Sequence, residues 1–163
     1  MTYLLDTNVL IEGSRFYYAF DLAPGYWDWL GAAHDRGEVA SVPAVKGEIT
    51  RGSDHLADWA RQLPDTFWMA ESSATVDSIA AAAAWVVNEP RGFTDAAQAE
   101  FLDSADLRII AEGQASGLTV VTRETSEPYR RNRVKIPDVC LGLTVACEAP
   151  FRVYSRLGLR LKI

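Results

Sequence analysis

Asp6 is the first residue of the sequence whose type and position suggest chemistry. It interrupts an apolar run, residues 3–11, and a buried carboxylate is costly unless it is paired or bound to a cation. Asn8 lies two residues further on and could aim its amide at the same point. The alternative is that Asp6 only caps the following turn through its side chain. We take Asp6 and Asn8 as candidate site residues.

A second polar group follows the clearest strand signal in the sequence, the apolar run 118–122. The hydroxyl of Thr122 can bind a water, a carboxylate or a phosphate oxygen, and Glu124 lies two residues further on. Working groups of parallel sheets gather beyond the carboxyl ends of the strands, so we expect Glu124 at the same rim as Asp6. The alternative is a loop glutamate paired with Arg123.

Further acids are expected on helices. Glu48 lies on a helical face that is half apolar, although most helical glutamates face solvent. Asp103 and Asp106 are one helical turn apart, and helix capping accounts for only one of them. Asp106 precedes Leu107 and lies where the helix face turns toward the core. We therefore take Glu48 and Asp106 as candidates, with Asp103 as an alternative fourth acid.

Short strands that alternate with helices are expected to position these acids. The predicted strands are 3–5, 39–40, 118–122, 134–136 and a half-buried final strand, 159–163. The predicted helices are 26–34, 43–51 capped by Ser41, 54–62, 73–87, a short one capped by Thr94-Asp95, one capped by Ser104 and stopped by Gly117, and two that begin near Pro137 and Pro150. This alternation predicts a single α/β domain over residues 1–163, with a parallel sheet covered on both faces.

Carboxylates gathered at one edge of a sheet repel one another unless a cation neutralises them. Magnesium prefers oxygen ligands, and it typically takes one or two carboxylates and keeps several waters. Such ions activate a water and stabilise the attacking and leaving oxygens of a phosphoryl displacement. The predicted cluster of Asp6, Glu48, Asp106 and Glu124 therefore implies a metal site.

These motifs resemble those of the PIN-domain ribonucleases. The run Leu4–Ile11 is similar to the family's first motif, an apolar strand that ends in D-x-N or D-x-S. Glu48 matches the helical glutamate of the family, and Asp106 matches the aspartate that opens a helix. The family's last motif is T-x-D, whereas this chain has T-R-E at residues 122–124, which lengthens the fourth acid. The resemblance covers nearly the whole chain in order and spacing.

The resemblance implies a three-layer α/β/α sandwich with a mainly parallel central sheet, and endonucleolytic cleavage of RNA that depends on Mg²⁺ or Mn²⁺. The four acids named above would hold one or two ions, while Asn8 and Thr122 would orient waters or the phosphate. Many small bacterial members are VapC-like toxins of type II toxin–antitoxin pairs. We therefore expect an RNA substrate, a cognate antitoxin protein and a homodimer.

Two other functions compete with this interpretation. A phosphatase of the haloacid-dehalogenase type also begins with a strand, but one that ends in D-x-D-x-T, and position 8 is Asn here. A catalytically silent PIN-like protein that only binds a partner is the second alternative, and it is favoured by the T-R-E departure and by the overall acidity. Nucleophilic chemistry is disfavoured, because the two histidines, His34 and His55, lie in polar helical contexts without a triad pattern.

Composition and charge set the remaining expectations. The net charge is −6, but residues 121–163 carry nine cations against four acids. The arginines of this basic segment are candidates to grip an RNA backbone, with a solvated loop as the alternative (Arg123, Arg130, Arg131 and Arg133). The two cysteines, Cys140 and Cys147, have no histidine nearby, which disfavours zinc. We expect a cytoplasmic protein without a membrane span or secretory signal.

Overall fold

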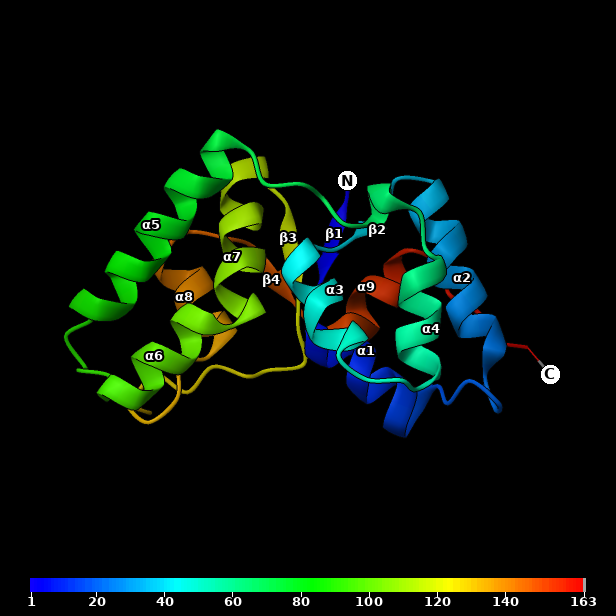
Figure 1. Ribbon diagram of the computed structural model, residues 1–163, viewed down its shortest axis with the longest axis horizontal. Helices are drawn as coiled ribbons and strands as arrows, with labels where there is room; N and C mark the ends of the chain where they lie inside the picture. Colours follow the sequence, from blue (N-terminus) through cyan, green and yellow to red (C-terminus); the bar gives the residue numbers. More distant parts are fainter. Residues whose placement is uncertain (163) are drawn as a thin grey trace.

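Strands and helices alternate along the chain in the computed structural model, which describes residues 1–162 (Figure 1). The strands are β1 (Tyr3–Leu5), β2 (Val39–Ala40), β3 (Thr119–Val121) and β4 (Cys147–Glu148). The α-helices are α1 (Thr7–Glu12), α2 (Pro24–Asp35), α3 (Pro43–Thr50), α4 (His55–Gln62), α5 (Ser73–Asn88), α6 (Asp95–Asp103), α7 (Ala105–Ser116), α8 (Ile136–Gly142) and α9 (Pro150–Arg156). A π-helix, η1 (Gly13–Tyr17), extends α1, and a 3₁₀-helix, η2 (Asp65–Phe67), precedes the bridge from Trp68 to Ser41.

The strands of residues 1–162 form one sheet of four, in the order β2-β1-β3-β4, and every pairing in it is parallel. In the register, Leu4 lies between Ala40 and Val120, and Val121 pairs with Glu148. The two central strands are buried along their whole length, as expected for a parallel sheet with helices on both faces. The predicted α/β class with a parallel central sheet is therefore confirmed.

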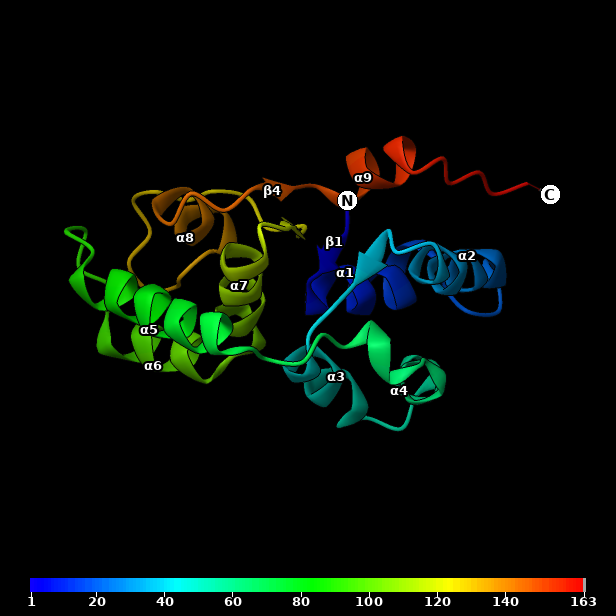
Figure 2. The same cartoon turned by 90° about the horizontal axis from the view of Figure 1, so that it is seen from above.

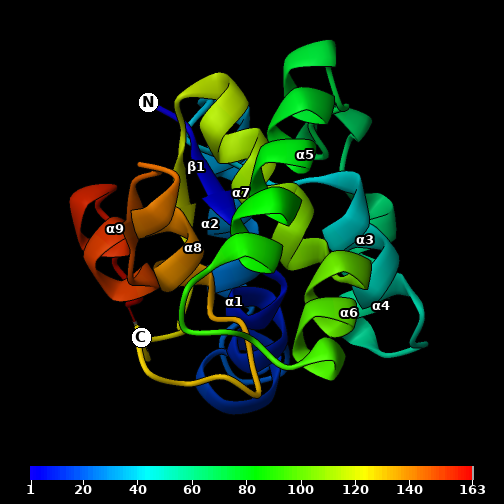
Figure 3. The ribbon, with the colours of Figure 1, turned by 90° about the vertical axis from the view of Figure 1, so that its left-hand side faces the viewer.

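Helices cover both faces of the sheet and make three layers. Seen from above, α8 and α9 lie on one side of the strands, and α3, α4, α5 and α6 lie on the other (Figure 2). The view from the side gives the same division (Figure 3). Helix α7 follows the sheet closely, because it packs against β3 as well as against α5 and α8. This α/β/α arrangement is the one expected from the sequence.

The carboxyl ends of the two central strands bring distant parts of the chain together. The backbone N–H of Asp6, just after β1, donates to the carbonyl of Val121 over 3.0 Å. Thr122, just after β3, donates its N–H to the carbonyl of Glu148 over 3.1 Å. The residues that follow adjacent parallel strands therefore meet at one edge, as the sequence predicts for Asp6 and Thr122.

Two predicted strands are wrong. Residues 134–136 form no strand: Val134 is a buried loop residue, and Ile136, also buried, is the first residue of α8. Residues 159–162 are irregular, Leu161 is about half exposed, and Ile163 lies outside the described residues. The outer strand on this side of the sheet is instead β4, which the sequence does not predict. A two-residue strand is defined by its partner and carries almost no local signal.

One predicted helix cap is wrong, a second lacks its side-chain hydrogen bond, and one helix is missed. Ser41 does not cap α3, because its hydroxyl donates to the carbonyl of Leu5 over 2.6 Å and Val42 takes the cap position. Ser104 is the N-cap residue of α7, as predicted, but its hydroxyl donates to the carbonyl of Phe101 instead of accepting an N–H group. Helix α1 begins directly after Asp6, where the apolar run does not distinguish a strand from a short helix.

Among the helices of residues 1–162, none has both the length and the apolar character that a bilayer crossing requires.

Candidate functional site

Asp6 is the most deeply buried acid at the carboxyl edge of the sheet. Its Oδ2 atom accepts a hydrogen bond from the hydroxyl of Thr122 over 3.0 Å, whereas Oδ1 is buried without any hydrogen-bond partner. Burial, followed by the negative charge of Asp106, raises the pKa of the Asp6 carboxyl well above its ordinary value. A proton or a cation at the unpartnered oxygen would therefore stabilise Asp6.

Glu48 joins three helices at the same edge. It projects from α3, and its Oε2 atom accepts the hydroxyl of Thr7, at the start of α1, over 2.7 Å. Its Oε1 atom accepts the backbone N–H of Ala105, the first residue of α7, over 3.0 Å. Glu48 therefore satisfies a free N–H at the N-terminus of α7, a role that the sequence analysis gives to the side chain of Ser104.

Asp106 lies one residue further along α7 and is half-buried. Burial raises the pKa of its carboxyl to about 7, and the negative charges of Glu124 and then Glu48 add to this effect. The guanidinium of Arg133 acts in the opposite direction, but it does not offset the other contributions. Asp106 is therefore close to half-protonated at neutral pH.

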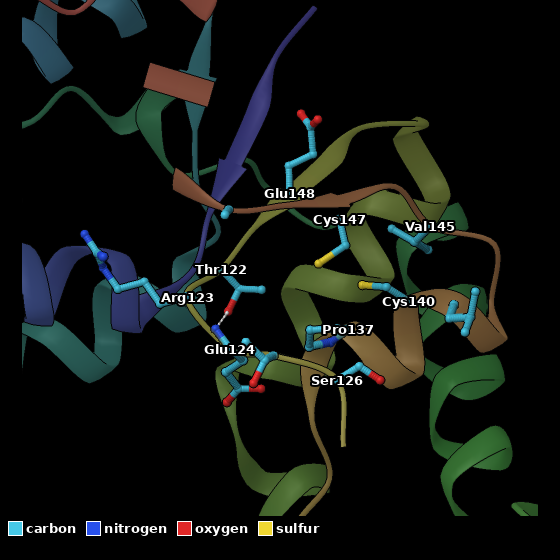
Figure 4. Close-up of a pocket in the computed structure, with 12 residues that line it drawn as sticks. Thr122, Arg123, Glu124, Ser126, Pro137, Cys140, Val145, Cys147 and Glu148 are labelled. Carbon is cyan, nitrogen blue, oxygen red and sulfur yellow. Dashed lines mark hydrogen bonds between the residues drawn. The ribbon is translucent and has the colours of Figure 1, made fainter. Parts of the chain in front are cut away.

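Glu124 accepts an N–H at the N-terminus of α8, as Glu48 does at the N-terminus of α7. Its own N–H donates to the hydroxyl of Thr122 over 3.1 Å, the dashed bond in Figure 4. Its carboxylate accepts the N–H of Ile136, the first residue of α8, over 2.8 Å, and it also contacts Arg133 at 3.4 Å. The extra methylene of Glu124, compared with the aspartate of the T-x-D motif, lets the carboxylate reach this helix.

The structure brings together four of the five acids considered from the sequence. Glu124 and Asp106 both raise the pKa of Asp6, and Glu48 raises that of Asp106, so these charges act on one another. Asp103 does not join them, because it is exposed at the end of α6 and not on α7. The two helices meet at Ser104, which separates Asp103 from Asp106 more than one continuous helix would.

The donor set fits a hard divalent cation. It consists of carboxylate oxygens, the Asp6 carboxylate is completely buried while the other three acids are partly buried, and Asp6 contributes an oxygen that has no other partner. However, within residues 1–162, no three Asp, Glu, His or Cys side chains are arranged as a ready-made metal cage. The oxygens of the two glutamates accept N–H groups of α7 and α8. An ion held by Asp6 and Asp106 would complete its shell with waters.

A polar cleft of about 390 Å³ opens beside the acids. Its lining includes Asn8 and three cations near residues 122–124. The full set is Asn8, Glu12, Arg123, Glu124, Thr125, Arg133 and Lys135. Asn8 therefore faces the same region as Glu124, as its spacing from Asp6 suggests. Lys135 is a lining residue that the sequence analysis does not single out, although it belongs to the basic segment.

Arg123 lies between two aromatic rings at the margin of this cleft. Its guanidinium carbon is 4.0 Å from the centroid of the Tyr17 ring and 4.8 Å from that of Phe151. Its Nε atom is 3.4 Å from Glu12, but Nε and Nη2 are buried without a hydrogen-bond acceptor. A charged group in this state gains free energy when an anionic oxygen reaches it. Tyr17 and Phe151 are far apart in the sequence, so no local pattern indicates this contact.

Arg130 and Arg131 are used within the protein. Arg130 contacts Glu127 at 2.9 Å and Asn132 at 2.9 Å. The guanidinium of Arg131 donates to the carbonyl of Gly92 over 2.8 Å. Of the four arginines that the sequence offers as candidates to grip a phosphate backbone, only Arg123 and Arg133 line the cleft.

Residues 3–161 of the chain match the model of one family, described as Domain of unknown function (DUF4411). Because the match spans nearly the whole chain, the protein belongs to this family. Neither a curated protein nor a solved structure matches the chain.

Proposed function

We propose that this member of the DUF4411 family is an endoribonuclease that depends on Mg²⁺ or Mn²⁺. The observation that carries the proposal is Asp6, a buried carboxylate with one unpartnered oxygen that lies within the electrostatic reach of Asp106 and Glu124. Retaining such a group costs stability unless a cation compensates it. Phosphodiester hydrolysis is the reaction for which a carboxylate-held divalent ion beside a cationic cleft is best suited.

Each residue of the site has a role in this proposal. Asp6 and Asp106 would hold the ion, which supplies an activated water and stabilises negative charge at the phosphate. Thr122 keeps Asp6 in place through its hydroxyl. Glu48 and Glu124 anchor α7 and α8 and contribute negative charge that strengthens the attraction for the ion.

The cleft supplies the binding of the substrate. Arg123, Arg133 and Lys135 place positive charge beside the acids, where a phosphodiester backbone would otherwise be repelled. Asn8 offers an amide that can hydrogen-bond a phosphate oxygen or a water. Arg133 contacts Glu124 and Glu100, and a phosphate that enters the cleft would compete for its guanidinium.

We further propose that the chain is the toxin of a toxin–antitoxin pair and acts as a homodimer in the cytoplasm. Support comes from exposed apolar side chains on η1 and α9, where Phe16, Tyr17 and Phe151 are each at least half exposed. The rings of Tyr17 and Phe151 contact each other, with centroids 5.7 Å apart. Exposed apolar patches of this kind are typical of protein interfaces, and an antitoxin bound here would lie beside Arg123.

The decisive experiment compares two neighbouring aspartates. Purified protein is freed of divalent ions and incubated with a fluorescent single-stranded RNA, with and without Mg²⁺ or Mn²⁺, and the products are separated on a denaturing gel. Internal cleavage should require the ion, and Asp106→Asn should lower its rate by about 100-fold or more. Asp103→Asn, a change of the same chemistry at an exposed position, should cleave like the unchanged protein. Cleavage that persists in Asp106→Asn would mean that the activity does not come from this site.

A second candidate function is a catalytically silent protein that only binds a partner. Two observations favour it: both glutamates bind helix N-termini, and residues 1–162 hold no preformed metal cage. Calorimetric titration with Mn²⁺ separates the two candidates. Binding that is lost in Asp6→Asn supports the nuclease, whereas no binding in either protein supports the silent protein.

A further inference from the structure

The two cysteines of the chain meet at the edge of the sheet. Cys140 belongs to α8 and Cys147 to β4, and the backbone between them turns back sharply, with Thr144 at a φ of 59° and the N–H of Val145 bonded to the carbonyl of Cys140 over 2.8 Å. The two sulfur atoms face each other in Figure 4. Both cysteines are free thiols.

The two thiols differ in access and in acidity. Both line a cavity of about 510 Å³ that also reaches Thr122 and Glu124, but Cys147 is partly exposed while Cys140 is completely buried. The interaction with the neighbouring thiol, and then burial, raise the pKa of Cys140, whereas the same interaction lowers the pKa of Cys147, although burial, Glu124 and Glu148 act against ionisation of Cys147. An accessible, more acidic thiol in front of a buried one is the arrangement of an attacking and a resolving cysteine.

We propose that Cys147 and Cys140 form an oxidisable dithiol, a modification site that reacts with hydroperoxides entering through the cavity. The Cys147 sulfur, as thiolate, attacks the terminal oxygen of the hydroperoxide. A sulfur–oxygen bond forms, the oxygen–oxygen bond breaks, and the alkoxide takes up a proton and leaves as an alcohol, or as water when the oxidant is hydrogen peroxide. The Cys140 sulfur then attacks the sulfur of Cys147, and the hydroxyl group leaves with the Cys140 proton as water. Two thiols lose two electrons in total, and one peroxide is reduced.

The position of this dithiol connects it to the carboxylates. Cys147 precedes Glu148, whose carbonyl accepts the N–H of Thr122. The hydroxyl of Thr122 in turn donates to Asp6. A disulfide that ties β4 to α8 would therefore be joined to Asp6 by two consecutive hydrogen bonds. The chemistry of the thiols itself is independent of the proposed nuclease activity, so either proposal can fail while the other stands.

The test measures the oxidation state of the full-length protein. Reduced protein is exposed to hydrogen peroxide, the remaining thiols are alkylated, and intact mass and peptide mapping follow the products. We expect the loss of two hydrogen atoms, no alkylation, and one peptide pair joined through Cys140 and Cys147. The mass and alkylation pattern return to their original state on treatment with a dithiol reductant. Two thiols that both remain open to alkylation after native oxidation would overturn the proposal.

Single variants assign the roles of the two thiols. Cys140→Ala should stop at a sulfenic acid on Cys147, which dimedone traps, whereas Cys147→Ala should leave Cys140 at least about tenfold slower to react. The same measurement on protein unfolded in urea should remove the difference in rate, because it arises from burial. Equal rates in the two folded variants would contradict the assignment of Cys147 as the attacking thiol, and with it the proposal.

Discussion

Two buried acids in different regions of the molecule show how differently a carboxylate can be accommodated. Glu112, on α7 where this helix packs against α5, accepts the hydroxyl of Thr75 over 2.8 Å with one oxygen and the hydroxyl of Ser116 with the other. Asp6, at the carboxyl edge of the sheet, has one partner, Thr122, and one oxygen with none. Both side chains are almost completely buried. They differ in hydrogen bonding and in the charges that surround them.

The difference separates a structural acid from a candidate functional one. Around Glu112, two hydroxyl donors supply the interaction that water would give, so the acid ties one helix to another. Around Asp6, the charges of Asp106 and Glu124 add repulsion to an incomplete set of partners. Burial of an acid therefore indicates function only in combination with an unsatisfied oxygen and neighbouring charges of the same sign.

The strongest test of the difference between Asp6 and Glu112 is to neutralise each acid and measure RNA cleavage. Asp6→Asn should reduce ion-dependent cleavage by about 1,000-fold, because it removes an oxygen that would hold the ion. Glu112→Gln has the same size and the same loss of charge, and it should change the rate less than about twofold because Glu112 is remote from the chemistry. Single-turnover cleavage at saturating Mg²⁺ gives both rates.

Equal losses in Asp6→Asn and Glu112→Gln would remove the distinction between the two acids. Circular dichroism of both variants serves as the control, because a loss of folding in Glu112→Gln would lower cleavage for an unrelated reason.

The second test uses the pH dependence of stability without divalent ions. Burial and neighbouring charges raise the pKa of Asp106 from 3.8 to about 7 in the folded protein. Because this pKa is raised, the protonated Asp106 contributes fully to stability below about pH 4, and its contribution is lost as the pH rises through about 7. Between pH 5 and pH 8 this corresponds to a loss of about 3 kcal/mol in the free energy of unfolding.

Urea unfolding in the presence of a chelator measures this loss. Asp106→Asn should flatten the pH dependence, and the difference between the variant and the unchanged protein removes contributions from other titrating groups. Added Mg²⁺ should restore stability at pH 8 in the unchanged protein only, because an ion that binds the folded state stabilises it. A stability that rises between pH 5 and pH 8 in metal-free protein would contradict the raised pKa.

The third test asks what Glu112 contributes. Glu112→Ala removes the acceptor shared by the hydroxyls of Thr75, which is buried, and Ser116, which is exposed, and this should lower the free energy of unfolding by about 2 kcal/mol. Glu112→Gln retains one acceptor oxygen and should cost less. Chemical denaturation of the two variants at pH 7 provides the values. A Glu112→Ala variant as stable as the unchanged protein would show that the two hydroxyls find other partners.

Local sequence predicts much of this architecture because strands and helices carry local signals. Apolar runs and caps place β1, β2, β3 and the long helix α5, and the parallel topology then brings Asp6 and Thr122 together. The strand β4 is not predicted, because it is only two residues long and is recognised by its pairing with β3, which the local sequence does not reveal. The alternating residues 159–162 suggest a strand, but they find no partner strand in the part of the chain that the structure describes.

The site is predictable in its acids and unpredictable in its hydrogen bonds. The types and spacing of residues single out Glu48, Asp106 and Glu124. That Glu48 accepts the N–H of Ala105, and Glu124 that of Ile136, depends on how α7 and α8 are placed by packing across the whole domain. For the same reason the sequence places Ser104 correctly as the N-cap residue of α7 but does not show that its hydroxyl bonds to Phe101, while Glu48 accepts the first N–H of the helix.

The smallest expected effect comes from shortening one of these two glutamates. Glu124→Asp keeps the charge and restores the T-x-D pattern, but the shorter side chain should no longer reach the N–H of Ile136 at the start of α8. Loss of such a contact at a helix N-terminus should cost about 1 kcal/mol of unfolding free energy. Cleavage should change less than about threefold, because the negative charge beside Asp6 and Asp106 remains. If cleavage instead falls as far as in Asp6→Asn, the longer side chain of Glu124 itself holds the ion. Glu124 would then belong with Asp6 among the functional acids, although its carboxylate has a hydrogen-bond partner.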